Sequence, residues 1–208
     1  MFYPVARRAF GGVALAAPLA AHGGPVVAAV QPDSFVDVLH TDHPAPDRAG
    51  KLALYGFLVG SWETAVVAHE ENGTTHTRRG EIHAGWVLEG RALQDVWMVP
   101  RRAERNADAQ PQPLPVTGSW YGTTLRVYDP GLDAWHIFWH NPATQLYTRQ
   151  IGRVRGSDIV QEGRHDSGAL MRWSFTKITP DSFHWLGEVS PDNGASWRLQ
   201  VEVLARRA

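Results

Sequence analysis

The segment WRLQVEVL, residues 197–204, alternates apolar and polar side chains over its whole length. Successive side chains of a β-strand point to opposite faces of the sheet, so Trp197 and Val203 would share one face and Arg198 and Glu202 the other. An antiparallel strand that has one face on a core and the other in water shows this pattern. The segment therefore predicts the last strand of an antiparallel sheet.

Upstream, the same period of two recurs in segments separated by short runs of turn residues. The ten predicted strands are 62–69, 75–88, 91–99, 123–128, 135–140, 145–154, 158–164, 169–176, 183–189 and 197–204. Consecutive hairpins with little helix between them predict an all-β fold, an up-and-down antiparallel barrel of about ten strands that can enclose a ligand. A two-sheet sandwich is the alternative architecture.

A short helix is predicted before the first strand, over residues 51–58, with Asp47 as its N-cap and Gly60 after its end. Such a helix would plug or flank one end of the barrel. The predicted organisation is therefore a linker with this helix over 33–60 and the barrel over 61–208. The connection 100–119 is too long for a hairpin and is predicted to be a lid or a disordered flap.

The first 32 residues have the order of an export signal. Arg7 and Arg8 precede a stretch, from Ala9 to Pro32, that contains no Lys, Arg, Asp or Glu. The arginine pair resembles a twin-arginine signal, which predicts a periplasmic or secreted protein; if the leader is only a disordered segment, the protein is cytoplasmic. Glycines and prolines interrupt the stretch, so no membrane span is expected.

Composition excludes several classes of function. The chain of 208 residues is long enough for one domain with a sizeable core, and its formal charge of −1 gives no field that would attract nucleic acid. Because cysteine is absent, disulfides, thiol nucleophiles and thiolate metal sites are excluded. The nine tryptophans indicate either barrel core or aromatic walls around a small hydrophobic or aromatic molecule.

Three motifs carry a family resemblance: Phe57–Trp62, which ends in Gly60-Ser61-Trp62 at the entry to the first strand, Gly85–Arg91, and Tyr121–Pro130. The first resembles the Gly-x-Trp signature of lipocalins and their relatives, the calycin superfamily. Together the three resemble a bacterial lipocalin-like family without an assigned activity, over the chain from about Lys51 onward. In that superfamily the motif tryptophan closes one barrel end against a basic residue near the chain terminus. The resemblance implies that Trp62 packs against one of the arginines at 206 and 207.

The densest group of candidate catalytic side chains is WHIFWH, residues 135–140. As a strand, this segment places His136, Phe138 and His140 on one face. The two histidines would lie ~13 Å apart, from a rise of ~3.3 Å per residue, so they cannot bind one metal ion, and no metal site is predicted. If this face is lumenal, one histidine is a candidate general acid or base and Phe138 a substrate contact. Otherwise the group lies on the outer surface.

The third predicted strand places Arg91, Asp95 and Trp97 on one face. Turned inward, Asp95 is the candidate catalytic carboxylate, and Arg91 and Trp97 are candidate substrate-binding residues. Turned outward, the charges form a surface pair of little energetic weight. The remaining substrate-binding candidates are His83, Tyr147, Glu162, Arg172 and Trp185.

Three functions remain open from the sequence. The preferred one is a cofactor-free lyase, isomerase or cyclase that uses histidine and carboxylate chemistry on a partly aromatic substrate in the lumen. The alternatives are a carrier of a hydrophobic ligand without turnover, and a haem-binding barrel with one histidine as axial ligand. A histidine–carboxylate pair in contact inside the pocket would favour the enzyme. An apolar pocket with few ionisable groups would favour the carrier.

Overall fold

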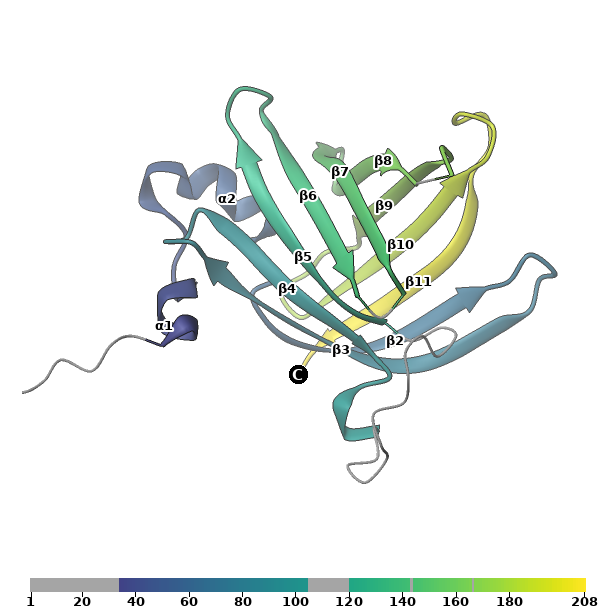
Figure 1. The fold of residues 1–208 in the computed structure, drawn as a ribbon, viewed down its shortest axis with the longest axis horizontal. Coiled ribbons are helices and arrows are strands. Elements are labelled where there is room, and N and C mark those ends of the chain that lie inside the picture. Colours follow the sequence, from purple (N-terminus) through teal and green to yellow (C-terminus); the bar gives the residue numbers. More distant parts are fainter. Residues whose placement is uncertain (1–33, 105–119, 143, 166) are drawn as a thin grey trace, which may run out of the picture. The chain divides into compact units, whose positions relative to one another are not determined.

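The computed structural model describes residues 34–104, 120–142, 144–165 and 167–208. These residues form an antiparallel β-barrel of ten strands (Figure 1). The barrel strands are β2 (Gly60–His69), β3 (Thr75–Val87), β4 (Ala92–Val99), β5 (Trp120–Asp129), β6 (Ala134–Asn141), β7 (Leu146–Arg155), β8 (Asp158–Arg164), β9 (Leu170–Thr176), β10 (Ser182–Ser190) and β11 (Arg198–Arg207).

Each barrel strand pairs with its neighbours in sequence, and β11 pairs with β2 to close the ring. The closing register joins Val201 to Ala68 and Arg207 to Trp62. A two-residue strand, β1 (His40–Thr41), adds to the end of β3 outside this ring. The up-and-down barrel of ten strands predicted from the sequence is therefore confirmed, and the sandwich is not the architecture.

The predicted helix before the first strand is present as α2 (Ala49–Gly56). The predicted cap is wrong: Arg48 occupies the N-cap position, and no side chain caps this helix. Asp47 belongs instead to a preceding 3₁₀ helix, η1 (Pro46–Arg48), and forms an ion pair with Arg91 at 3.1 Å.

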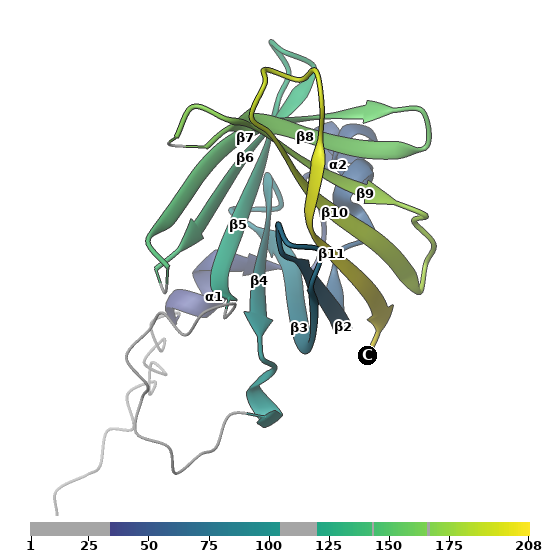
Figure 2. The same ribbon diagram turned by 90° about the vertical axis from the view of Figure 1, so that its right-hand side faces the viewer.

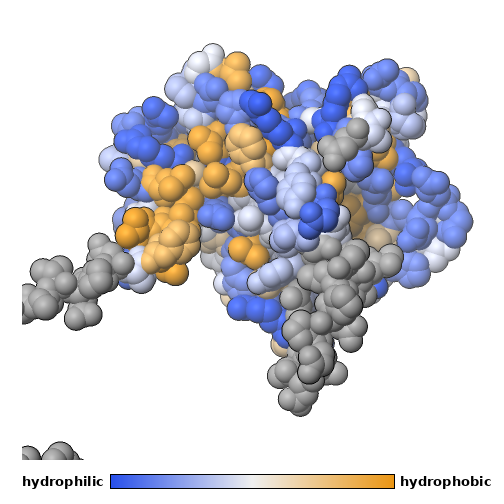
Figure 3. Space-filling model, viewed as in Figure 1, coloured by the Kyte–Doolittle hydropathy of each residue, from blue (hydrophilic) through white to orange (hydrophobic). Residues whose placement is uncertain are grey.

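Two further short helices lie near the barrel, α1 (Phe35–Leu39) and the 3₁₀ helix η2 (Arg102–Glu104). The apolar side chains Phe35, Val36 and Val38 of α1 are exposed, and Figure 3 shows apolar side chains gathered in that region. In the described ranges, every helix is too short or too polar to span a bilayer. The predicted export signal, 1–32, and most of the predicted lid, 105–119, lie outside the described residues and stay predictions.

Helix α2 plugs one end of the barrel, where Figure 2 shows it behind β9 and β10. Its side chains Leu52 and Tyr55 are fully buried, and the Tyr55 ring meets Trp135 and Phe175 edge to face. Aromatic edge-to-face pairs of this kind add to the burial of apolar area. This end of the barrel is therefore filled by side chains.

Trp62 completes the closed end. Its side chain is buried, and its indole N–H donates to the carbonyl of Leu58 at 2.8 Å. The guanidinium of Arg207 lies 3.9 Å from the centre of the Trp62 ring. The contact implied by the Gly-x-Trp resemblance is thus confirmed, with Arg207 as the basic residue.

Candidate functional site

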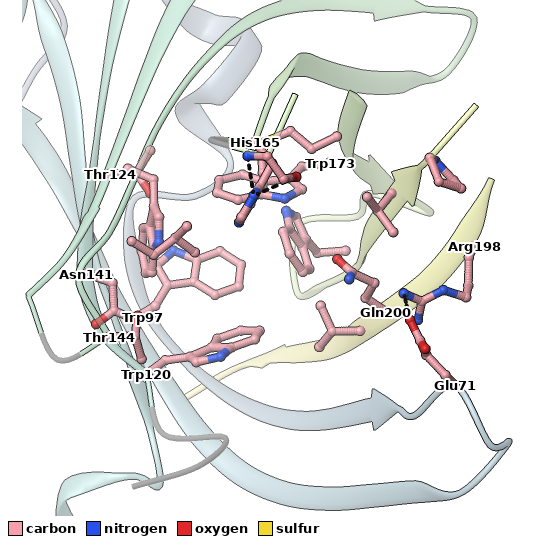
Figure 4. Close-up of a pocket in the computed structure, with 18 of the residues that line it drawn as sticks. Glu71, Trp97, Trp120, Thr124, Asn141, Thr144, His165, Trp173, Arg198 and Gln200 are labelled. Atoms are coloured by element: carbon pink, nitrogen blue, oxygen red, sulfur yellow. Dashed lines mark hydrogen bonds and ion pairs between the residues drawn. The ribbon is translucent and has the colours of Figure 1, made fainter. Parts of the chain in front are cut away.

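The barrel contains a cavity of about 700 Å³ that begins beyond the plugged end. Its rim is built from the hairpin loops opposite α2: Glu71 follows β2, Thr144 precedes β7, His165 follows β8 and Pro191 follows β10. In antiparallel barrels, such loops can be varied without disturbing the ring of strands. The cavity opens among these loops (Figure 4).

Five tryptophans form the walls of the cavity, one from each of five strands. They are Trp97 (β4), Trp120 (β5), Trp139 (β6), Trp173 (β9) and Trp185 (β10). Their ring centres are separated by 5.4 Å for Trp97 and Trp185, 5.5 Å for Trp173 and Trp185, and 6.2 Å for Trp139 and Trp173. These spacings are those of interacting aromatic rings, so the wall is a nearly continuous aromatic surface.

A buried ion pair lies at the floor of the cavity. Arg126 Nη1 donates to Asp95 Oδ2, and the backbone N–H of Thr124 donates to Asp95 Oδ1 at 3.0 Å. The side chains of Arg126 and Asp95 are 2% and 0% exposed. On the plug side, the guanidinium lies 5.2 Å from the centre of the Tyr55 ring, while Arg126 and Thr124 also line the cavity. The pair therefore separates the aromatic plug from the open lumen.

Further polar groups are buried inside the barrel without a hydrogen-bond partner among the described residues. They are the amides of Gln150 and Gln161, the hydroxyls of Tyr55 and Thr148, Nε of Arg126 and Nε1 of Trp97. Burial raises the pKa of the Tyr55 hydroxyl above its ordinary value, so this side chain stays an uncharged donor. Each unpartnered group costs about 1–3 kcal/mol. Such a concentration in one interior is typical of a site shaped for binding rather than for packing.

A second pair of opposite charges lies at the rim, where Arg198 Nη2 donates to Glu71 at 3.0 Å (Figure 4). Arg198 and Gln200 both line the cavity, although the alternation in 197–204 predicts that they face solvent. That prediction is wrong because a β-bulge interrupts the β10–β11 ladder between Gly187 and Glu188. A bulge adds one residue to one strand and so changes which side chains face inward beyond it.

The structure places the histidine face of β6 on the outer wall. His136 Nε2 lies 2.9 Å from Asp129 Oδ2, and His140 lies beside Tyr147, which is 47% exposed. Phe138 is on the same outer face. The large apolar side chains of this strand take the lumen instead, so the cavity does not contain the two histidines proposed as acid–base candidates. In the described ranges, no group of three or more His, Asp or Glu side chains is arranged to hold a metal ion.

Three of the residues chosen from the sequence lie inside the barrel, namely Asp95, Trp97 and Trp185. Three charged candidates lie outside it in ion pairs with neighbours. Glu162 pairs with Arg155 at 2.5 Å, Arg172 with Glu188 at 2.8 Å, and Arg91 with Asp47. Partly exposed pairs of this kind contribute little to stability. These three residues are therefore partners in surface ion pairs and not parts of the cavity.

His83 belongs to a chain of hydrogen bonds on the outer face of β2 and β3. Its Nδ1 lies 2.8 Å from Ser61 Oγ and its Nε2 lies 3.3 Å from Glu81. Arg102 donates to Glu81 through its backbone N–H at 2.9 Å and through Nε at 2.7 Å. Burial alone would raise the pKa of Glu81, but the hydrogen bonds from Arg102 and His83 together lower this pKa to about 2.

We expect Glu81→Gln to destabilise the protein at pH 7 by about 1–3 kcal/mol, because it removes the charge that two Arg102 donors and His83 bind. A folded-state pKa near 2, below the ordinary 4.5, contributes stability above pH 4.5 that is lost as the pH falls toward 2. The gap between parent and variant should therefore shrink over that range. Urea unfolding at several pH values measures it, with the exposed Glu89→Gln as control; a gap independent of pH would contradict the assignment.

The haem alternative requires an imidazole that can reach an iron atom in the cavity. Of the described lining residues, His165 is the histidine at the cavity. Its Nδ1 accepts a hydrogen bond from the backbone N–H of Ser167 at 3.2 Å. In this arrangement Nδ1 is engaged and the proton of a neutral ring lies on Nε2, so binding to iron would require the proton to move or the bond from Ser167 to break. A haem would therefore have to compete with the hydrogen bonds of this loop for its axial ligand.

Several residues of the site had no individual signal in the sequence. Thr124 and Arg126 face the lumen, whereas the apolar Leu125 and Val127 that alternate with them face outward. This is the reverse of the hydrophobic-in pattern, and it arises because the barrel encloses a partly polar space. The wall tryptophans could have been found by strand parity, but only after the inward face of each strand was known.

Comparisons with known proteins support the fold. No family model matches the sequence, and no curated protein is significantly similar to it. Among the solved structures that match is Rv2717c from M. tuberculosis, with a TM-score of 0.52 and 16% identity over 79% of this chain and 99% of that one. Another is the S-type phycobiliprotein lyase CPES from Guillardia theta, with a TM-score of 0.49 and 12% identity over 75% of this chain and 91% of that one. At these identities the likeness concerns the fold alone, and the chain is a lipocalin-like barrel of ten antiparallel strands.

Proposed function

We propose that the protein binds a small, flat, largely aromatic molecule in the barrel cavity and releases it unchanged, as a carrier or sensor does. The observation that carries this proposal is the wall of five tryptophans around a cavity of about 700 Å³. A concave site of this size, apolar on its walls and with a few polar groups at one end, is typical of small-molecule binding. Indole rings favour a ligand that stacks on them, which means a planar one.

The positions of the ionisable groups favour binding over turnover. A lyase, isomerase or cyclase, the function preferred from the sequence, needs an acid–base pair in reach of its substrate. The pairs of histidine and carboxylate that the structure forms, such as His136 with Asp129 and His184 with Glu202, lie on the outer wall. At the cavity, Arg126 is held by Asp95 and Arg198 by Glu71. Groups fixed in ion pairs are poor proton donors, which supports a binding protein.

We expect Val189→Trp to weaken ligand binding by at least about tenfold, which is 1.4 kcal/mol of binding free energy. Val189 lines the cavity from β10 and is not fully buried, so a larger side chain there extends into the lumen. N-phenyl-1-naphthylamine, an uncharged aromatic dye whose emission rises in apolar sites, is the probe for the measurement. Leu186→Trp places the same ring on the outer face of the same strand and should bind like the parent.

Two results would contradict the proposal: a parent protein that does not bind the dye, or equal affinities for Val189→Trp, Leu186→Trp and the parent. Unfolding of both variants in urea verifies that the barrel is intact before the affinities are compared.

A further inference from the structure

The charges around the cavity cancel in pairs, and this restricts what the cavity can bind. The ion pair of Arg126 with Asp95 at the floor is neutral as a unit, and both side chains are almost completely removed from water. At the rim, Arg198 and Glu71 form a second neutral unit. The arginines among the described lining residues are Arg126 and Arg198, and each has a carboxylate beside it.

The floor nevertheless keeps hydrogen-bonding capacity. The guanidinium of Arg126 has five N–H donors, and Asp95 accepts from only one of its nitrogens, Nη1. Its Nε has no partner among the described residues, and neither has Nε1 of Trp97, which belongs to the adjacent wall. Both side chains line the cavity and are at least nine-tenths buried. The unused polar groups of both side chains are N–H donors, so they favour a hydrogen-bond acceptor on the ligand.

We propose that the ligand is an uncharged aromatic compound with a carbonyl-type oxygen, an aryl ketone, aldehyde or quinone, and that this oxygen is seated at the Arg126 end of the cavity. This inference rests on the proposed function and adds the chemical class of the ligand. The ring system stacks between the tryptophans, and the oxygen accepts from the donors of the floor. A hydrogen bond from a charged donor is stronger than one between neutral groups, so the oxygen orients the ligand as well as binding it.

A carboxylate on the ligand is disfavoured at this position. It would bring a second negative charge next to Asp95, in an environment that removes both from water. Like charges in a desolvated site repel, and one of the two groups then has to take up a proton. A pure hydrocarbon is disfavoured for the opposite reason, because it covers the floor and leaves its donors without a partner.

Three naphthalenes of similar shape separate these cases: 2-acetylnaphthalene, 2-naphthoate and 2-isopropylnaphthalene. Their affinities for the intact protein are measured at pH 7 by displacement of N-phenyl-1-naphthylamine. We expect 2-acetylnaphthalene to bind at least about tenfold more tightly than either of the others, a difference of 1.4 kcal/mol. If 2-naphthoate binds most tightly, or the hydrocarbon binds as well as the ketone, this inference is wrong and the proposed function stands. If neither the dye nor any of the three binds, the proposed function itself fails.

Asp95→Asn tests the electrostatic reason directly. The substitution keeps the shape of the side chain and an oxygen acceptor for Arg126, but removes the neutralising charge. We expect the order to reverse, with 2-naphthoate gaining at least about tenfold in affinity while 2-acetylnaphthalene changes little. Asp129→Asn, which removes a carboxylate from the outer wall, is the matched control and should keep the parental order. An unchanged order in folded Asp95→Asn would overturn the inference, and the three probes on the parent decide it if that variant does not fold.

Discussion

Replacement of Arg126 by Met is expected to lower the free energy of unfolding by about 3–5 kcal/mol. The variant removes one partner of an ion pair whose side chains are 2% and 0% exposed, so the carboxylate of Asp95 is left buried and unpaired. The backbone N–H of Thr124 still donates to it, but one hydrogen bond does not replace a neutralising charge. The guanidinium also packs against the rings of Tyr55 in the plug and Phe175 on β9, and Met fills part of that volume.

A double variant separates the effect of the lost charge from that of the lost packing. In the double variant Asp95→Leu/Arg126→Met both charges are gone, and replacing a whole buried ion pair by apolar residues is often neutral or stabilising. We expect the double variant to recover most of the loss. Arg155→Met is the control, because its pair with Glu162 is more than one-third exposed and should contribute less than about 1 kcal/mol. Urea unfolding measures all three; a single variant that loses no more than Arg155→Met would contradict this account.

Ligand binding by the same double variant shows whether the ion pair serves folding alone or also binding. If the ion pair serves only folding, the double variant should bind the three naphthalenes in the parental order. If it forms the binding floor, the double variant should lose most of the preference for 2-acetylnaphthalene over 2-isopropylnaphthalene, because the charged guanidinium donors are gone from that end. Burying this ion pair costs desolvation free energy, and a role in binding explains best why the barrel contains it. The affinities of the double variant test that explanation.

The barrel could be predicted because its determinants are local. Period-two segments and turn residues such as Asn72-Gly73 define hairpins within a few residues, and β8 has the bounds that the pattern predicts, Asp158–Arg164. The helix before the first strand was also local in origin. The predicted cap failed because Asp47 forms an ion pair with Arg91, which lies far away in the sequence. Whether this carboxylate caps the helix or pairs with Arg91 is decided by a contact that forms only in the folded barrel.

The site depended on information that no single segment contains. Asp95 faces the interior of the barrel, one of the two orientations that the sequence left open. Its partner is Arg126 on β5, because the register of β4 against β5 sets Asp95 opposite Thr124. Which face of a strand is lumenal was equally open for the segment with His136. The large rings of that segment settled it, since they occupy the interior and leave the histidine on the outer wall.

Replacement of Trp62 by Ala is expected to cost about 3–5 kcal/mol of unfolding free energy, the range for a fully buried large aromatic side chain. Trp62 is 1% exposed and meets Phe183 edge to face with 4.8 Å between ring centres. Its loss opens a cavity at the closed end and removes the donor that binds the carbonyl of Leu58. It also removes the ring against which the guanidinium of Arg207 packs. That guanidinium donates to the carbonyl of Val59 at 2.6 Å and to two further backbone carbonyls.

Trp197→Ala is the matched control, because Trp197 also carries an arginine on its face, with Arg172 4.0 Å from the ring centre, but lies on the outer wall. A cation–π contact at such a site contributes about 0.5–1 kcal/mol. The two variants therefore share the interaction and differ in burial, and urea unfolding of both measures the difference. A loss for Trp62→Ala no larger than that for Trp197→Ala would show that the closed end is held by α2 alone. A loss several times larger means that the Gly-x-Trp element stabilises the barrel through burial, with the arginine contact as a smaller addition.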